Sequence, residues 1–239
     1  MNQVDYDHFW DGRWQDMILY SPAPRIRRKL VRKIVGRYFR PGASILDVGC
    51  GSCLLLKELG EAFPTAKLAG CDLSEKIVAE NTRLYPHLTF AQLNLSDPQP
   101  IGQTYDLITC TEVLEHVPDF DQAMKNLWNF LNPGGILVVT VPGGKLYPID
   151  QQVGHLRHFE DPAPFRGKGF EVLALNYWGF PFFNLYKYLI NIDPEWSQSS
   201  FNEGAYTPKQ KLISNFIYGL FNFNLPFAGE QLFVVLQKK

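Results

Sequence analysis

The chain has 239 residues, of which 46% are hydrophobic, and a formal net charge of −1 at pH 7. This length allows one domain with a substantial core, and a charge so close to zero gives no overall attraction to nucleic acid. Four cysteines at scattered spacing, with no leader peptide recognised, are typical of reduced cytoplasmic thiols, and no apolar run reaches the ~18 residues of a membrane span. We therefore expect a single cytoplasmic domain over residues 1–239, with no nucleic-acid partner and no stable membrane insertion.

Residues 1–40 predict a helical lid. An aromatic-rich leader at residues 6–14 precedes a Ser-Pro-Ala-Pro run at 21–24, which is a typical start signal for a helix. Apolar residues at helical spacing from Ile26 to Tyr38 indicate one buried face. The opposite face is strongly basic, and we interpret it as solvated because acids elsewhere cancel its charge and no second basic stripe occurs.

A glycine turn joins the first predicted strand, residues 44–48, to the following helix. The chain reads Asp-Val-Gly-Cys-Gly from Asp47, with Gly49 and Gly51 in the turn, and the second predicted strand leads into Asp72. Glycines at such a turn let a ligand approach the backbone closely, and an acid at the next strand end can accept both hydroxyls of a ribose. The spacing predicts a nucleoside site; a helix cap is the alternative role for Asp72, although Ser74 is better placed for it.

The same residues distinguish a dinucleotide cofactor from a cofactor with a single nucleoside. A dinucleotide loop has a third glycine where this chain has Leu54, and Asp47 would repel a pyrophosphate. An acid there suits a ligand with an ammonium and a sulfonium. The stretch resembles motif I of the class I S-adenosylmethionine-dependent methyltransferases, Asp-x-Gly-x-Gly-x-Gly, with Cys53 in place of the third glycine. The resemblance implies S-adenosyl-L-methionine as cofactor, and a nicotinamide-dependent oxidoreductase or epimerase is the alternative.

Alternating strand and helix patterns predict a parallel, doubly wound α/β sheet with right-handed crossovers. The clearest helix runs from Phe120 to Leu131, before a Pro-Gly-Gly break. The resemblance implies a Rossmann-like sheet of seven strands with the last one antiparallel, built from residues 41–177 and 231–239. The predicted strands are residues 44–48, 67–71, 88–93, 105–110, 136–141, 170–177 and 231–237.

The resemblance also assigns further cofactor contacts. Asn94 stands where the family usually has an acid that contacts the adenine amino group; its side-chain oxygen can accept the same hydrogen bond, with Asp97 as the rival. Arg25 corresponds to an arginine near the N-terminus that reaches the cofactor carboxylate in similar enzymes. The predicted cofactor-binding residues are Arg25, Asp47, Gly49, Cys50, Gly51, Asp72, Leu73, Asn94, Leu95, Thr111 and Glu112.

Residues 111–117 read Thr-Glu-Val-Leu-Glu-His-Val and follow the fourth predicted strand. This run is similar to one in the quinone-pathway O-methyltransferases, where the segment lines the methyl-transfer centre. Glu112 and His116 are four residues apart, so on a helical turn they would share a face. For Glu115, structural hydrogen bonding is an equally weighted interpretation.

Residues 154–159 read Gly-His-Leu-Arg-His-Phe and follow the fifth predicted strand. His155 and His158 are the best candidates for a general base because imidazole titrates near neutral pH, and His116 is a third. A His-x-x-His pair can bind metal, but the sequence suggests no Cys or acid partner nearby, so we expect no metal. The helix that usually follows is expected to be truncated, because residues 160–166 are short and proline-broken.

Two cysteines, Cys50 and Cys53, form a Cys-x-x-Cys at the start of a helix, where the dipole lowers a thiol pKa. A redox enzyme is therefore an alternative. Against it, Asp72 and the later strands have no role in a thioredoxin-like fold, and we interpret the four cysteines as small core residues.

The connection over residues 178–230 is long, and fifteen aromatic residues occur from Tyr177 to Phe227. That is too many for a solvated linker, so we expect one or two helices that cap the active-site mouth above a largely apolar or aromatic acceptor. Burial in a homodimer is the main alternative. The sequence as a whole predicts methyl transfer to an oxygen or nitrogen of such a small molecule; a catalytically silent methyltransferase-like subunit is a further alternative.

Overall fold

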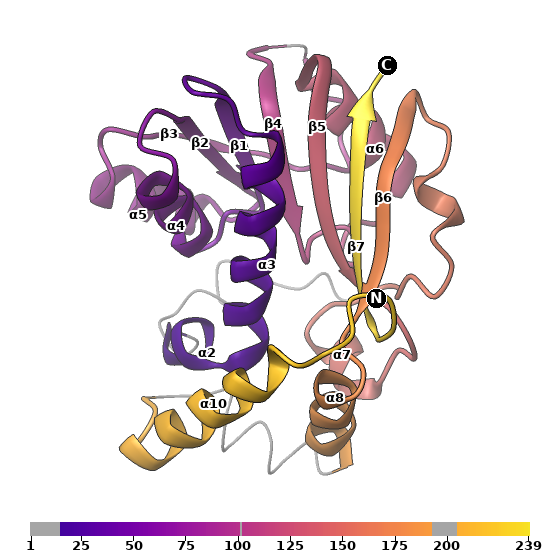
Figure 1. Ribbon diagram of the computed structural model, residues 1–239. Helices are drawn as coiled ribbons and strands as arrows, with labels where there is room; N and C mark the ends of the chain where they lie inside the picture. The colour runs from indigo at the N-terminus through magenta and orange to yellow at the C-terminus, as the bar shows by residue number, and fades with distance from the viewer. Residues whose placement is uncertain (1–14, 101, 193–204) are drawn as a thin grey trace.

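The computed structural model describes residues 15–100, 102–192 and 205–239 (Figure 1). The aromatic leader at residues 6–14, expected to form part of the lid, lies outside these ranges.

Seven strands form one sheet in the order β3-β2-β1-β4-β5-β7-β6. Six of them run in the same direction, and β7 is antiparallel to both of its neighbours, β5 and β6. The predicted doubly wound sheet with an antiparallel last strand is confirmed. The strands are β1 (Ser44–Val48), β2 (Lys67–Asp72), β3 (Thr89–Gln92), β4 (Tyr105–Thr111), β5 (Leu131–Pro142), β6 (Phe170–Trp178) and β7 (Gln231–Lys238).

Helices cover both faces of the sheet. In Figure 1, α3 crosses one face and α6 lies behind the other. The described helices are α2 (Gln15–Tyr20), α3 (Pro22–Tyr38), α4 (Leu54–Ala62), α5 (Glu75–Leu84), α6 (Phe120–Asn129), α7 (Pro148–Gln152), the 3-10 turn η1 (Ala163–Phe165), α8 (Phe182–Ile192) and α10 (Pro208–Phe221).

Successive residues of β1 point into opposite layers of the core. Ile45 packs in one cluster with Val31 and Val35 of α3, whereas Leu46 packs in another with Met124 of α6. Because both faces of the sheet are covered, a ligand can bind only at the ends of the strands. From β1 the chain proceeds outward to β2 and β3 on one side, and it then returns to β4 and β5 on the other side, so the strand order reverses between β1 and β4. The carboxyl ends of these two strands therefore mark the expected binding crevice.

The largest boundary differences from the sequence prediction lie between α6 and β5. The predicted helix over 120–131 ends at Asn129, and β5 begins at Leu131, so the Pro-Gly-Gly break lies inside a strand. The reason is pairing with β4, because Leu131 pairs with Tyr105 across a register shift and the Tyr105 amide donates to the Phe130 carbonyl. The truncated helix after Phe159 is confirmed as η1, which has three residues.

The connection from β6 to β7 contains α8 and α10, and α10 packs against α3 and α2. No helix within the described ranges is both long enough and apolar enough to cross a membrane.

Candidate active site

The turn after β1 is held in a left-handed conformation at three positions. Gly49 has φ +71°, Gly51 +46° and Cys53 +60°, and the amides of Gly49 and Cys50 both donate to the Cys71 carbonyl, at 2.8 and 3.0 Å. A Cβ at Gly49 would lie 2.3 Å from Cγ2 of Val113. The turn therefore needs glycine at Gly49, while Cys53 adopts the backbone conformation that the family's third glycine would take without strain.

Asp72, at the end of β2, fixes this turn from the side. Its Oδ2 accepts a hydrogen bond from the Gly51 amide at 2.9 Å, and its Oδ1 accepts one from the Ser74 amide at 3.1 Å. Ser74, not Asp72, caps α5, since its hydroxyl accepts from the Ile77 amide. A carboxylate offers about four lone-pair sites, so a residue of this type can serve both the turn and a ligand hydroxyl.

Asp47 is a second acid beside the turn. Its side chain is buried and accepts a hydrogen bond from the Thr109 hydroxyl at 2.7 Å. Burial raises the pKa of Asp47 to about 7; the Thr109 hydrogen bond opposes this shift and the Asp72 charge adds to it. A cation bound nearby would favour the ionised carboxylate and reverse the shift.

The other predicted cofactor residues lie around these acids. Asn94 makes a local turn: its Oδ1 accepts from the Ser96 amide at 3.0 Å and its Nδ2 donates to Asp97 at 2.9 Å. Leu95 is buried in the core, and the Leu73 carbonyl accepts from the Gln92 side chain.

Arg25 is engaged by α10. Its guanidinium lies 4.2 Å from the ring centroid of Tyr218 and donates to Asn215 Oδ1 at 2.8 Å. The neighbouring Arg27 instead forms an ion pair with Glu112, and Arg28 pairs with Glu58. The interpretation of this whole basic face as solvated is therefore wrong for these residues.

Glu112 follows Thr111 at the end of β4. Its Oε1 accepts from the Thr140 hydroxyl at 3.0 Å and from the Gln231 side chain at 2.9 Å, so together with Arg27 it links α3, β4, β5 and β7. The predicted helical turn from Glu112 to His116 is wrong. Glu112 has φ +55°, and the chain instead forms a tight turn.

The three predicted histidines come together. The rings of His116 and His155 meet edge to face with centroids 4.7 Å apart, and His155 Nδ1 lies 3.0 Å from His158 Nε2. His158 Nδ1 lies 3.3 Å from the Gly144 carbonyl. The expectation that no acid lies nearby is wrong, because Asp150 is 3.4 Å from His158 Nε2 and Glu115 adjoins His116 and His155.

Burial lowers the pKa of all three imidazoles. His155 is affected most, to about 2, because His116, His158, Lys187 and Arg27 add positive charge to the desolvation. A neutral imidazole with so low a pKa is a weak proton acceptor. Burial has the opposite effect on Glu115, whose pKa it raises well above the usual range, with the Glu112 charge adding to the shift.

The connection between β6 and β7 contributes a cation to this edge. Lys187 of α8 is 9% exposed; its Nζ donates to the Gly143 carbonyl at 3.2 Å and lies 3.5 Å from Glu230. A pocket of about 410 Å³ adjoins the cluster and is lined by Gly144, Leu146, Arg157, His158, Phe159, Glu160, Asp161 and Pro164.

A larger cavity, of about 780 Å³, is lined by residues of α4 and β2, such as Leu68, together with Tyr85 after α5 and Tyr105 of β4. None of the predicted site residues lines it, so we do not assign it to the same site.

The redox alternative receives no support from the turn. All four cysteines are free and buried. The hydrogen bond with Cys53, burial and the nearby acids together raise the pKa of the Cys50 thiol, which is the reverse of what a redox-active thiolate needs.

Residues 46–137 match the family model described as a methyltransferase domain. The chain is 35% identical to trans-aconitate 2-methyltransferase of Deinococcus radiodurans over 104 residues, which cover 43% of this chain and 39% of the relative. It is 41% identical to ubiquinone biosynthesis O-methyltransferase of Coxiella burnetii over 105 residues, which cover 40% and 42%. The chain thus spans about two fifths of the length of these curated relatives.

A solved structure extends the likeness to the fold as a whole. The N-methyltransferase NodS of Bradyrhizobium japonicum, in complex with S-adenosyl-L-homocysteine, matches with a TM-score of 0.61 at 13% identity, over 98% of this chain and 99% of that chain. Residues 46–137 therefore resemble a methyltransferase domain, and the chain as a whole shares its fold with a solved methyltransferase.

Three charged residues at this site were missed from sequence. Arg27 is one of seven basic residues on its helix, and Asp150 lies on α7, which was not predicted. Lys187 carried a signal, since it is the one charge in the apolar run 178–190. A lone lysine in such a run is buried only with partners, which here are Gly143 and Glu230.

Proposed function

We propose that this protein transfers the methyl group of S-adenosyl-L-methionine to an oxygen, or a nitrogen, of a small molecule with a largely apolar or aromatic body. The observation that carries the proposal is the glycine turn held by Asp72 at the carboxyl ends of β1 and β2. It is a nucleoside-binding geometry with an added buried acid, Asp47, where a pyrophosphate site would have none.

The residues present fit this cofactor. Asp72 would accept the ribose hydroxyls through its remaining lone pairs, and Asn94 and Leu95 would face the adenine. Asp47 and the turn at Gly49 would bind the methionine end of the cofactor, which carries the ammonium and the sulfonium. Val113 leaves no room for a Cβ at Gly49, so the backbone of the turn stays bare at this position.

The bound cofactor supplies an activated methyl donor, since the C–S bond breaks with its electron pair passing to a positively charged sulfur. The protein has to align the acceptor in line with that bond, exclude water and receive the acceptor's proton. His158, His155 and His116 stand at the same sheet edge, and a hydrogen bond joins His155 to His158. His158 lines the adjoining pocket and would receive the acceptor's proton. The acceptor oxygen forms the new bond as its proton leaves.

The acceptor side combines polar and apolar groups. Lys187 and the histidines are the polar groups, and α8 also carries Tyr186 and Tyr188 on the connection that we propose as the cap. An aromatic hydroxyl compound matches both parts, because its ring meets apolar side chains while the oxygen meets the histidines. Exposed side chains such as Leu212 and Phe216, 71% and 68% exposed, keep homodimer burial as the second candidate role of this connection.

Methyl transfer from labelled S-adenosyl-L-methionine to a panel of acceptors tests the proposal. The panel holds phenols and catechols with apolar substituents, a set of amines, and polycarboxylates of the kind that the name of the Deinococcus relative implies. We expect turnover of the aromatic hydroxyl compounds. Good turnover of polycarboxylates or free amino acids, with every hydrophobic acceptor inert, would contradict the proposed acceptor class.

A further inference from the structure

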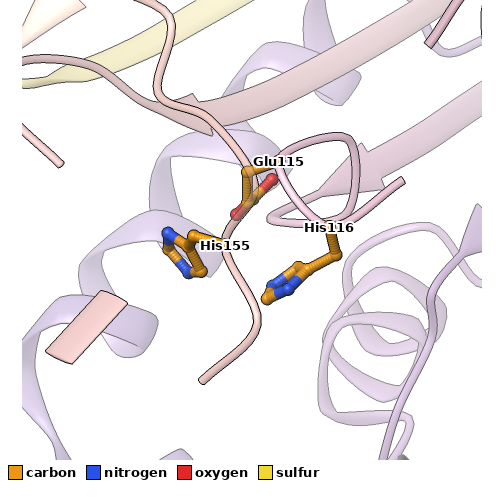
Figure 2. A group of neighbouring side chains, drawn as sticks. All are labelled: Glu115, His116 and His155. Carbon is orange, nitrogen blue, oxygen red and sulfur yellow. The ribbon is translucent and has the colours of Figure 1, made fainter. Parts of the chain in front are cut away.

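Three side chains from two segments form a compact group of potential metal ligands. Glu115 and His116 lie on the turn after β4, and His155 lies just after α7. Each contributes one ligand atom, and these atoms all lie within 4.8 Å of one another. Figure 2 shows the Glu115 carboxylate and the two imidazoles gathered around a common space.

Glu115 is the anomaly in this group. It is 0% exposed, and among the described residues neither of its carboxylate oxygens has a hydrogen-bond partner. Burying a carboxylate without partners is costly, so such residues are found paired or bound to a metal ion. The nearby cations are already occupied, since Arg27 pairs with Glu112 and Lys187 lies beside Glu230.

The hydrogen bonds of the histidines prepare His155 as a ligand. A carbonyl only accepts, so the Gly144 carbonyl places the proton of neutral His158 on its Nδ1. Nε2 of His158 then accepts from Nδ1 of His155, which leaves the lone pair of His155 on Nε2. A histidine that ligates a metal is commonly oriented in this way, through its other ring nitrogen.

A second group, Asp150, His155 and His158, also has ligand atoms within 4.8 Å of one another. Its members are already satisfied by other partners. Asp150 accepts from the Tyr147 amide at 2.9 Å, and His158 contacts Asp150, His155 and the Gly144 carbonyl. Because the Glu115 carboxylate has no such hydrogen-bond partner within the described part of the chain, we choose the group of Glu115, His116 and His155 as the candidate metal site.

We propose that Glu115, His116 and His155 bind a divalent transition-metal ion, with Zn²⁺ as the reference ion. Two imidazoles and one carboxylate are a known donor set for Zn²⁺ and for Fe²⁺, with bonds of about 2.0–2.2 Å and open positions for a further ligand. In a tetrahedral site, such bonds place the ligand atoms about 3.4 Å from one another.

The proposed role of the ion rests on the proposed function. An acceptor hydroxyl or carboxylate would take an open position on the ion. A bound cation lowers the pKa of a hydroxyl that it coordinates, so the proton passes to solvent and the oxygen is left as the nucleophile.

The test is Zn²⁺ binding to tag-free, chelator-treated protein, measured by calorimetry and by the shift in thermal unfolding. We expect one ion per chain. Glu115→Gln and His155→Ala should each weaken binding by more than about 100-fold, which exceeds the 10–100-fold that the loss of an outer-sphere partner typically costs. His87→Ala is the matched control, because His87 is exposed and lies outside the group, and it should bind as the wild type does.

Co²⁺ in place of Zn²⁺ identifies the ligands by absorption. The spectrum should lack a thiolate-to-metal band, since the four cysteines take no part. Wild-type protein that binds no more tightly than Glu115→Gln, or a thiolate band, would overturn the proposal. Glu115→Gln keeps the shape of the side chain, so a folded variant is available even if His155→Ala fails to fold. Binding of S-adenosyl-L-methionine to the same metal-free protein reports on the proposed function separately.

Discussion

The two sides of the sheet edge are constructed differently. The side that we assign to the cofactor is formed by Asp47, the turn at Gly49 and Gly51, and Asp72, all within 26 consecutive residues at the ends of two adjacent strands. The side that we assign to the acceptor brings together Glu112 to His116, Asp150 to His158, Lys187 and Glu230, from four distant segments. The first is a local motif, whereas the second exists only once the chain has folded. Variants should therefore act on the two sides separately.

The largest effect should come from Gly49→Ala. The new Cβ would meet Val113 Cγ2 at 2.3 Å in a left-handed conformation, so we expect a loss of about 2–4 kcal/mol in the free energy of unfolding and no measurable cofactor binding. Gly42→Ala is the control, with φ +83° and nothing within 4 Å, and should cost only the backbone strain of about 1–2 kcal/mol. Equal losses in both variants would show that the contact with Val113 is unimportant.

Asp72→Ala should come next. It removes the carboxylate that holds the Gly51 amide and would accept the ribose hydroxyls, and hydrogen bonds to a charged group are the stronger kind. We expect the affinity for S-adenosyl-L-methionine to fall by ~1.5–3 kcal/mol, measured by calorimetry. Asp72→Asn keeps one acceptor oxygen and should lose less. Wild-type affinity in Asp72→Ala would refute the assignment.

Asp47 gives a pH-dependent effect. Its pKa is raised to about 7 in the folded state from 3.8, so the folded protein holds this proton more tightly, and ionisation removes stability as the pH rises from about 4 to 7. Asp47→Asn cannot ionise, so its gain in unfolding free energy over wild type should grow across that range, by up to about 4 kcal/mol. Denaturant unfolding at pH 4.5 and 8 measures it. A gain that is the same at both pH values would mean that Asp47 is not buried as a neutral acid.

The smallest effect should be that of Arg25→Ala on cofactor binding. The guanidinium is already held by Tyr218 and Asn215 of α10, so we expect less than a threefold change in affinity and a loss of about 1 kcal/mol in stability. Lys29→Ala, from the same helix, is the control for charge. A tenfold loss of affinity in Arg25→Ala alone would instead support the cofactor-carboxylate role that the family resemblance suggests.

The strands and the glycine turn were predictable because their signals are local. Apolar runs of five or six residues and the Asp-x-Gly-x-Gly spacing lie within single segments, and the sheet order follows from the family resemblance. The pairings of Arg27 with Glu112 and of Lys187 with Glu230 join residues 85 and 43 positions apart, and no local pattern encodes them. The turn at Glu112 was mispredicted for the same reason, since its conformation is set by partners on α3, β5 and β7.

The most direct test of the account is calorimetric titration of the wild-type protein and of Lys187→Met with S-adenosyl-L-methionine and, separately, with NAD⁺. If the glycine turn is the cofactor side and Lys187 belongs to the acceptor side, both proteins should bind S-adenosyl-L-methionine at one site per chain, with affinities within about threefold of each other, and neither should bind NAD⁺. Binding of NAD⁺ without binding of S-adenosyl-L-methionine would contradict the assignment of the cofactor, and loss of S-adenosyl-L-methionine binding in a folded Lys187→Met variant would contradict the division of the edge into two sides.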